Sequence, residues 1–124
     1  MNNKIVLIDD DKDILDVVQF ILTEEGYNVV SYDHLIQLEA IVAQQPSVIL
    51  LDNRLGSGYG NTLCLAVKSN DSTKDIPVIL VSASEGLELI AKQCRADAWL
   101  SKPFDLAAFV KLVKQYWESY NASH

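Results

Sequence analysis

Short apolar runs alternate along the chain with longer segments in which apolar residues recur every three or four positions. The short runs are rich in β-branched residues, which is typical of strands buried on both faces of a parallel sheet. They predict strands at Ile5–Ile8, Val29–Tyr32, Val48–Leu51, Val78–Val81 and Ala98–Leu100. The periodic segments predict helices over 13–25, 34–44, 62–69, 84–94 and 105–119.

The first predicted helix is apolar on more than one side. One face carries the residues expected to pack on the core, which are Ile14, Val17, Val18 and Ile21. Further apolar residues lie outside that face, namely Leu15, Phe20 and Leu22. These extra residues indicate either a surface for a partner or deeper burial of the helix.

Five alternations of strand and helix predict an α/β protein with a parallel sheet and helices on both of its faces. Residues 1–124 are expected to form one domain, with a disordered tail at 121–124. Asp33 and Asp105 stand where helix N-caps are expected. In such sheets ligands bind beyond the carboxyl ends of the strands, so the residues after each strand are the candidates for function.

Composition and charge exclude several classes of function. The net charge of −7 argues against direct binding to nucleic acid. The two cysteines, Cys64 and Cys94, have no metal-binding spacing and are expected to be reduced core thiols of a cytoplasmic protein. No apolar stretch approaches the roughly 18 residues of a membrane span, and the N-terminal apolar run is too short for a signal peptide.

Polar residues with related chemistry follow four of the five predicted strands. They are Asp9, Asp10, Asp52, Ser82 and Lys102. Each alone is commonly a helix cap, a turn residue or part of a solvated loop, but together they meet at one edge of one sheet. Clustered carboxylates suit Mg²⁺, which relieves their mutual repulsion. A metal, an ammonium and a hydroxyl together suit a phosphoryl group, and a carboxylate can accept that group as an acyl phosphate.

The stretches "LIDDD", "ILLDNRL", "LVSAS" and "WLSKPF" stand in the order and near the spacing found in receiver domains of two-component response regulators, which the whole chain resembles. The resemblance implies a flavodoxin-like, doubly wound five-stranded parallel sheet of order 2-1-3-4-5, an order that this family exemplifies. It also implies a phosphorelay switch that catalyses only its own phosphorylation and dephosphorylation.

The resemblance assigns a role to each residue of the set. Asp52 is the expected phosphoacceptor, Asp10 the direct Mg²⁺ ligand and Asp9 a ligand acting through water. The backbone carbonyl of Arg54 is a further expected metal ligand. Lys102 is expected to pair with the phosphoryl group. The peptide bond between Lys102 and Pro103 is expected to be cis. Ser82 is expected to hydrogen-bond to the phosphoryl group.

Several positions depart from the family pattern. Trp99 replaces the usual Tyr or Phe of the switch, and its larger indole is expected to reshape that switch. Gly56 replaces a proline in the loop "GSGYG", which predicts a flexible loop beside the site. Arg54 and Ser84 are expected to modulate the lifetime of the phosphoryl group. Arg95 replaces a glycine at a helix end, and the fourth helix is expected to be truncated.

The expected partners are a histidine kinase or a histidine phosphotransfer protein, docking on the first helix and the loop before the last. A homodimer or an output protein is expected on the face formed by the fourth helix, fifth strand and last helix. Two alternatives remain open at this point. One is a Mg²⁺-dependent phosphohydrolase with an aspartyl nucleophile, and the other is a constitutive interaction module that is never phosphorylated.

Overall fold

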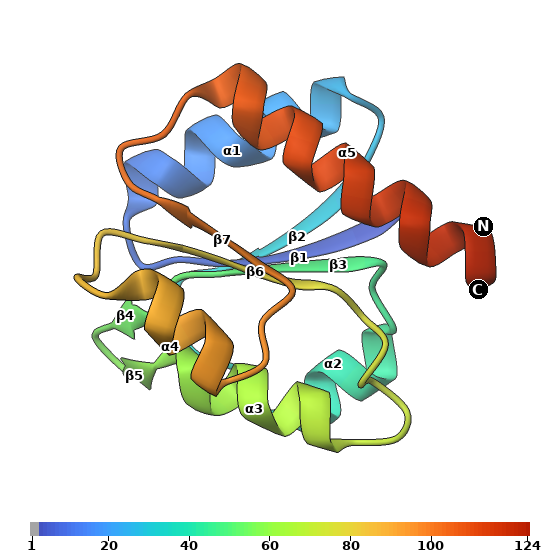
Figure 1. Ribbon diagram of the computed structural model, residues 1–124. Helices are drawn as coiled ribbons and strands as arrows, with labels where there is room; N and C mark the ends of the chain where they lie inside the picture. The colour runs from blue at the N-terminus through green and yellow to red at the C-terminus, as the bar shows by residue number, and fades with distance from the viewer. Residues whose placement is uncertain (1–2) are drawn as a thin grey trace.

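Residues 3–124, which the computed structural model describes, form one parallel sheet between two layers of helices (Figure 1). The strands are β1 (Lys4–Ile8), β2 (Asn28–Tyr32), β3 (Val48–Leu51), β6 (Val78–Ser82) and β7 (Ala98–Ser101). Their order across the sheet is β2-β1-β3-β6-β7. Counted along the chain this is 2-1-3-4-5, so the predicted doubly wound fold is confirmed.

Helices cover both faces of the sheet. Helices α1 (Lys12–Glu24) and α5 (Leu106–Ser123) lie on one face, and α2 (Leu38–Gln44), α3 (Gly60–Ser69) and α4 (Leu87–Gln93) lie on the other (Figure 1). Alternate residues of β1 enter different cores: Val6 and Ile8 pack in one, and Ile5 and Leu7 in the other. Both sides of the strand are therefore buried, which explains why its apolar run is continuous.

The face that helix α1 turns to the sheet agrees only in part with the one predicted, because Val18 is buried and Ile14 packs against the core, but Val17 does not. Its buried residues are Leu15, Val18 and Leu22. Val17, which was assigned to the core, is 46% exposed, and Phe20 is 65% exposed. Both sets of residues recur at helical spacing, so periodicity alone could not choose between them. Leu15 and Leu22 are core residues, and Phe20 remains on the surface.

Two predicted N-caps have different outcomes. The Asp105 carboxylate accepts a hydrogen bond from the Ala108 N–H at 2.9 Å, which confirms it as the cap of α5. Asp33 caps no helix, because α2 begins only at Leu38, after Gln37. A cap at Asp33 would need the amides two or three residues further on, but the Leu35 N–H donates to the Ser57 hydroxyl at 3.0 Å instead.

The fourth helix is short, as predicted, and it ends at an unusual backbone conformation. Helix α4 has 7 residues and is therefore shorter than the predicted segment 84–94. Arg95, which follows it, adopts a left-handed conformation with φ 63°. Its guanidinium donates to the Ser69 hydroxyl at 2.7 Å, so the side chain is tied to the end of α3. Cys64 and Cys94 are free and buried nearby.

The end of the chain is helical where a disordered tail was expected. Helix α5 continues to Ser123, so three of the four residues of the segment 121–124 belong to it. The side-chain amide of Asn121 donates to the Trp117 carbonyl at 3.0 Å and to the Ser47 hydroxyl at 3.1 Å. These bonds tie the last turn to the segment before β3. Among the described residues, no helix is both long and apolar enough to cross a bilayer.

Gly60 lets the start of α3 pass directly against the end of β3. A Cβ atom added at Gly60 would stand 2.2 Å from the Asp52 carbonyl oxygen and 3.0 Å from the Leu51 side chain. The first distance is much shorter than a van der Waals contact, and the atom that would be met belongs to the backbone, which cannot easily move aside. The glycine is therefore required for the close packing of this helix against the end of β3, where Asp52 follows the strand.

We predict that Gly60→Ala lowers the free energy of unfolding by about 1–3 kcal/mol, because the added methyl group must push the backbone at Asp52 aside. Gly56→Ala is the matched control, since its added Cβ would meet only the Asp10 carboxylate at 3.8 Å, an ordinary contact. Urea unfolding measures both. A Gly60→Ala variant as stable as Gly56→Ala would show that this approach is not tight in solution.

Candidate functional site

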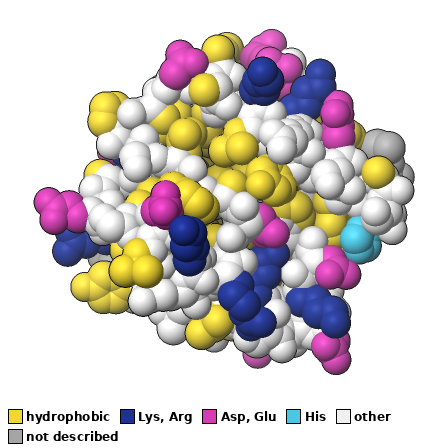
Figure 2. Space-filling view, in the orientation of Figure 1, with side chains coloured by type: hydrophobic (Ala, Val, Ile, Leu, Met, Phe, Trp, Pro, Cys, Tyr) yellow, Lys and Arg dark blue, Asp and Glu magenta, His cyan; other side chains and the backbone are white. Residues whose placement is uncertain are grey.

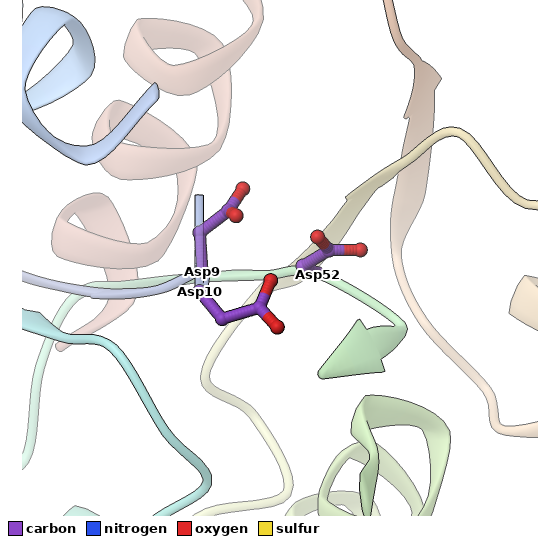
Figure 3. Close-up of side chains that lie close together, drawn as sticks. All are labelled: Asp9, Asp10 and Asp52. Carbon is purple, nitrogen blue, oxygen red and sulfur yellow. The ribbon is translucent and has the colours of Figure 1, made fainter. Parts of the chain in front are cut away.

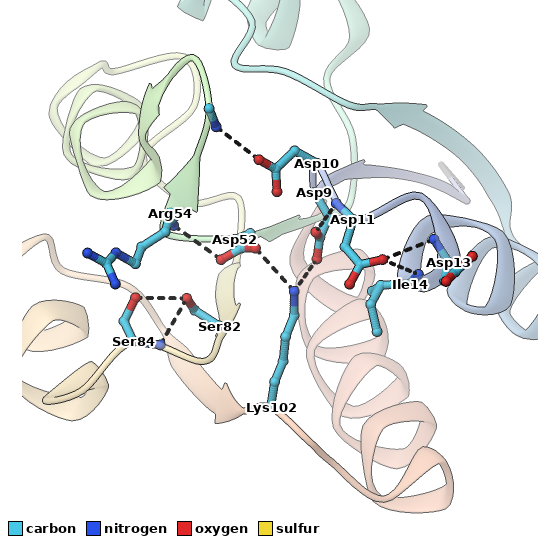
Figure 4. A network of polar contacts seen from close by, with 11 residues as sticks. Asp9, Asp10, Asp11, Asp13, Ile14, Asp52, Arg54, Ser82, Ser84 and Lys102 are labelled. Atoms are coloured by element: carbon cyan, nitrogen blue, oxygen red, sulfur yellow. Dashed lines mark hydrogen bonds and ion pairs between the residues drawn. The ribbon is translucent and has the colours of Figure 1, made fainter.

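The carboxyl ends of four neighbouring strands bring the predicted site residues together. Strands β1 and β3 pair with Ile8 opposite Leu51, so the residues that follow each strand emerge side by side. Strand β6 pairs with β3 on one side and with β7 on the other. This parallel register gathers the side chains at one edge of the sheet, as Figure 4 shows; they are Asp9, Asp10, Asp52, Ser82 and Lys102.

Lys102 is the counter-charge of the two buried aspartates. Its Nζ donates to the Asp9 Oδ2 at 2.7 Å and to the Asp52 Oδ2 at 3.1 Å (Figure 4). The side chains of Asp9 and Asp52 are only 3% and 8% exposed, and that of Lys102 is 15% exposed. The Lys102-Pro103 peptide bond is cis, as the resemblance implies.

Burial and ion pairing shift the pKa of each of these groups in opposite directions. Burial raises the pKa of the Asp9 carboxyl above its ordinary value, although the hydrogen bond from Lys102 and that from the Asp11 amide lower it. Burial alone would lower the pKa of the Lys102 ammonium. The hydrogen bonds and charges of Asp9 and Asp52 outweigh that effect, so the pKa of Lys102 is raised. The ammonium is therefore held firmly in its charged form.

Each carboxylate of the cluster accepts a backbone N–H. The Asp11 amide donates to Asp9 at 2.9 Å, and the Arg54 amide donates to Asp52 at 3.2 Å. Both donors stand two residues after their acceptor. The donor to Asp10 comes from far along the chain, because the Gly56 amide reaches the Asp10 Oδ2 at 2.9 Å.

The three aspartates can hold a metal ion. Asp9, Asp10 and Asp52 each offer a carboxylate oxygen, and these oxygens lie within 4.8 Å of one another (Figure 3). Asp9 and Asp52 are buried and Asp10 is exposed, so a cation could reach the cluster from the side of Asp10. An all-oxygen donor set with an open side fits a hard cation that keeps part of its water shell, such as Mg²⁺.

The side chains of Ser82 and Arg54 lie near the cluster but are directed toward Ser84 (Figure 4). Ser82 as a whole is 1% exposed, and its hydroxyl lies 3.0 Å from the Ser84 hydroxyl and accepts a hydrogen bond from the Ser84 amide at 3.3 Å. The Arg54 side chain turns away from Asp52 toward Ser84 (Figure 4). With Ser84 and Glu85, Arg54 lines an open cavity beside the site. Trp99, on β7, is 36% exposed.

The connection after β3 holds structure that the sequence analysis missed. Where a flexible loop was predicted, β4 (Arg54–Leu55) pairs with β5 (Gly58–Tyr59) as a small antiparallel hairpin. Gly56 and Ser57 form its turn. Two turn-forming residues between two short runs can indicate a hairpin, but runs of two residues give too little periodicity to recognise.

Comparisons with known proteins agree on one family. The model of the response regulator receiver domain matches residues 5–114. The structure is similar to a CheY-like receiver domain protein from Methanospirillum hungatei, with a TM-score of 0.85, 22% identity and 100% coverage of both chains. It is equally similar (TM-score 0.85, 22% identity, 95% and 99% coverage) to the receiver domain of a sensor histidine kinase from Pseudomonas aeruginosa, which has a magnesium ion coordinated in its active site cleft.

A third similar structure belongs to a longer protein. The response regulator DrrB of Thermotoga maritima, an OmpR/PhoB homologue, is 27% identical with a TM-score of 0.79. The match covers 96% of this chain and 54% of DrrB.

We predict that Lys102→Met lowers the free energy of unfolding by about 3 kcal/mol near neutral pH, because two buried carboxylates lose their counter-charge. The pKa of Asp9 then rises further. A carboxyl whose pKa is raised by folding contributes less stability as the pH rises through that pKa, so the deficit should be smaller at about pH 5 than at about pH 8.

Urea unfolding of the wild type and the variant at both pH values measures this difference. Lys111→Met, which removes the same charge from the exposed side of α5, is the control and should change little. A deficit for Lys102→Met that is equal at both pH values would show that the lysine stabilises the fold by packing rather than by its charge.

Proposed function

The chain belongs to the response regulator receiver domain family, and we propose that it is a signalling switch that accepts a phosphoryl group on Asp52. The observation that carries this proposal is the position of Lys102, whose ammonium bridges Asp9 and Asp52 beside the exposed Asp10. That arrangement offers a nucleophile, a fixed positive charge and a cation site within one small space.

In the proposed reaction a carboxylate oxygen of Asp52 attacks the phosphorus of a phosphohistidine or of acetyl phosphate. A new bond forms between that oxygen and phosphorus, while the bond from phosphorus to the donor breaks and the donor keeps its electron pair. Lys102 neutralises charge on the phosphoryl oxygens. A bound Mg²⁺ would add electrostatic stabilisation of those oxygens, with Asp10, Asp52 and the Arg54 carbonyl as proposed ligands and Asp9 acting through water.

The proposed switch begins at Ser82. Its hydroxyl now contacts the Ser84 hydroxyl, and it would leave that contact to donate to a phosphoryl oxygen on Asp52. We propose that this exchange moves the end of β6. Trp99 lies on the neighbouring strand, where it pairs with Leu80 of β6, so it is placed to respond to such a movement.

Exposed apolar side chains support the proposed partner surfaces. On α1, Val17 and Phe20 are 46% and 65% exposed, which supports docking of a histidine kinase or phosphotransfer protein there. Figure 2 shows hydrophobic side chains across the region of β7, α4 and α5. Large hydrophobic residues exposed in this region are Leu89, Trp99 and Leu106. We propose this second face for a homodimer or an output protein.

We predict that acetyl phosphate with Mg²⁺ adds one phosphoryl group to the wild type and none to Asp52→Asn, because the amide is nearly isosteric but is not a nucleophile. Intact mass spectrometry measures the product. Asp11→Asn is the control, because Asp11 belongs to the same acidic run but serves as the N-cap of α1, a role that asparagine also fills. Equal phosphorylation of Asp52→Asn would assign the reaction to another residue, and turnover of phosphate esters would favour a phosphohydrolase.

Arg54 provides a separate prediction about the lifetime of the phosphoryl group. A phosphoryl group adds roughly −1.5 to −2 charges, and the nearby guanidinium can fold back over it and obstruct the in-line approach of water. Arg54→Ala should therefore lose phosphate faster than the wild type after the donor is removed. Ser84→Ala, which changes another residue lining the same cavity, tests whether that side chain also contributes. A slower or unchanged rate in Arg54→Ala would contradict shielding.

A further inference from the structure

Asp10 differs from the other two aspartates in how its carboxylate is oriented. Asp9 and Asp52 each accept an N–H from their own loop, two residues further along. Asp10 is exposed, and it accepts the N–H of Gly56, 46 residues away in the turn of the β4–β5 hairpin. An exposed carboxylate without such a donor would rotate among several side-chain conformations.

The hairpin that carries this amide is fixed at both ends. At its base, the Asn53 carbonyl accepts the Gly60 N–H at 2.7 Å, and the Asn53 side chain accepts the Asn61 N–H at 3.0 Å. In its turn, the Ser57 hydroxyl accepts the Leu35 N–H at 3.0 Å. The Gly56 N–H is therefore held by the fold in the place where it meets Asp10.

We propose that the Gly56 N–H is a positioning group that orients Asp10 as a ligand for the divalent cation, an inference that rests on the proposed function. Only one oxygen of Asp10 is engaged by the amide, and Figure 4 shows the other on the side facing Asp9 and Asp52. A carboxylate can ligate a metal through one oxygen while its second oxygen stays hydrogen-bonded, and such outer contacts commonly change metal affinity 10–100-fold.

This arrangement also couples the cation to the surface of the hairpin. If the amide favours the metal-binding orientation of Asp10, then by linkage the bound metal favours the hydrogen-bonded hairpin by the same free energy. The hairpin ends in Tyr59, which is 58% exposed. Metal binding therefore stabilises a surface segment that a partner can contact, before any phosphoryl transfer takes place.

Two substitutions at the same position separate the amide from the side chain. Gly56→Pro removes the N–H, and the preceding Leu55 is already in the extended conformation that proline requires of its neighbour. Gly56→Ala keeps the N–H and adds a methyl group in ordinary contact with Asp10. Mg²⁺ is titrated into each unphosphorylated protein and followed by amide chemical shifts. We expect Gly56→Pro to bind Mg²⁺ about tenfold more weakly and Gly56→Ala to bind it like the wild type.

Ser57→Ala separates the hydrogen bond to Asp10 from the general order of the hairpin, because it removes the contact to Leu35 and leaves the Gly56 amide in place. We expect its Mg²⁺ affinity to fall by less than that of Gly56→Pro, because the base of the hairpin still holds the Gly56 amide. In the wild type, hydrogen exchange of the Gly56 amide should slow when Mg²⁺ is added, and in Asp10→Asn it should not respond.

Several outcomes would overturn this proposal. Tighter Mg²⁺ binding by Gly56→Pro, with faster exchange of the Gly56 amide in wild-type protein on adding Mg²⁺, would show that the amide competes with the metal. Equal weakening by Gly56→Pro and Ser57→Ala would assign the effect to hairpin order alone. Absence of Mg²⁺ binding in the wild type would instead contradict the proposed function, so the two failures are distinguishable.

Discussion

The pairing of Lys102 with Asp9 and Asp52 is the interaction on which the arrangement of this site depends. Without Lys102, the two carboxylates, which are almost fully buried at neighbouring strand ends, would repel each other, and nothing would compensate for their lost hydration. The lysine arrives from the fifth strand of the sheet, on the far side of β6 from β3, and contacts both. This counter-charge offsets the repulsion between the two acids, and so allows both carboxyl groups to stand at the edge of a hydrophobic sheet.

The backbone supplies the second requirement, which is orientation. Gly60 allows α3 to start against the Asp52 carbonyl, and the loop between them turns back so that its amides face the carboxylates. Local amides serve Asp9 and Asp52, and the amide of Gly56 serves Asp10. The two buried acids are thus oriented by amides that follow their own strands, whereas the exposed Asp10 depends on the hairpin.

The strand runs and the residues after them predicted the sheet, its two helical layers and the set of polar groups at its carboxyl edge. Those features follow from strict constraints, since buried parallel strands need apolar residues on both faces and strand ends converge by topology. The exact face of α1 could not be predicted: Val18 was assigned to the core correctly, but Leu15 and Val17 are both apolar and only packing decides which of them is buried. The contact of Gly56 with Asp10 was not predicted either, because every residue except proline carries a backbone N–H and the sequence does not show which acceptor that N–H meets.

The balance of charge explains why the cluster suits a divalent cation and then a phosphoryl group. When ionised, three aspartates and one lysine leave a local charge of −2, because the single ammonium of Lys102 cannot neutralise all of Asp9, Asp10 and Asp52. In the proposed function, a divalent cation on the exposed side of Asp10 would bring that charge to zero. The approach of an anionic phosphoryl donor to Asp52 would then no longer be opposed by net negative charge at the site. The cation and the lysine would therefore have different roles, because Lys102 already compensates the buried acids within the fold, whereas the cation would make the site compatible with an anionic substrate.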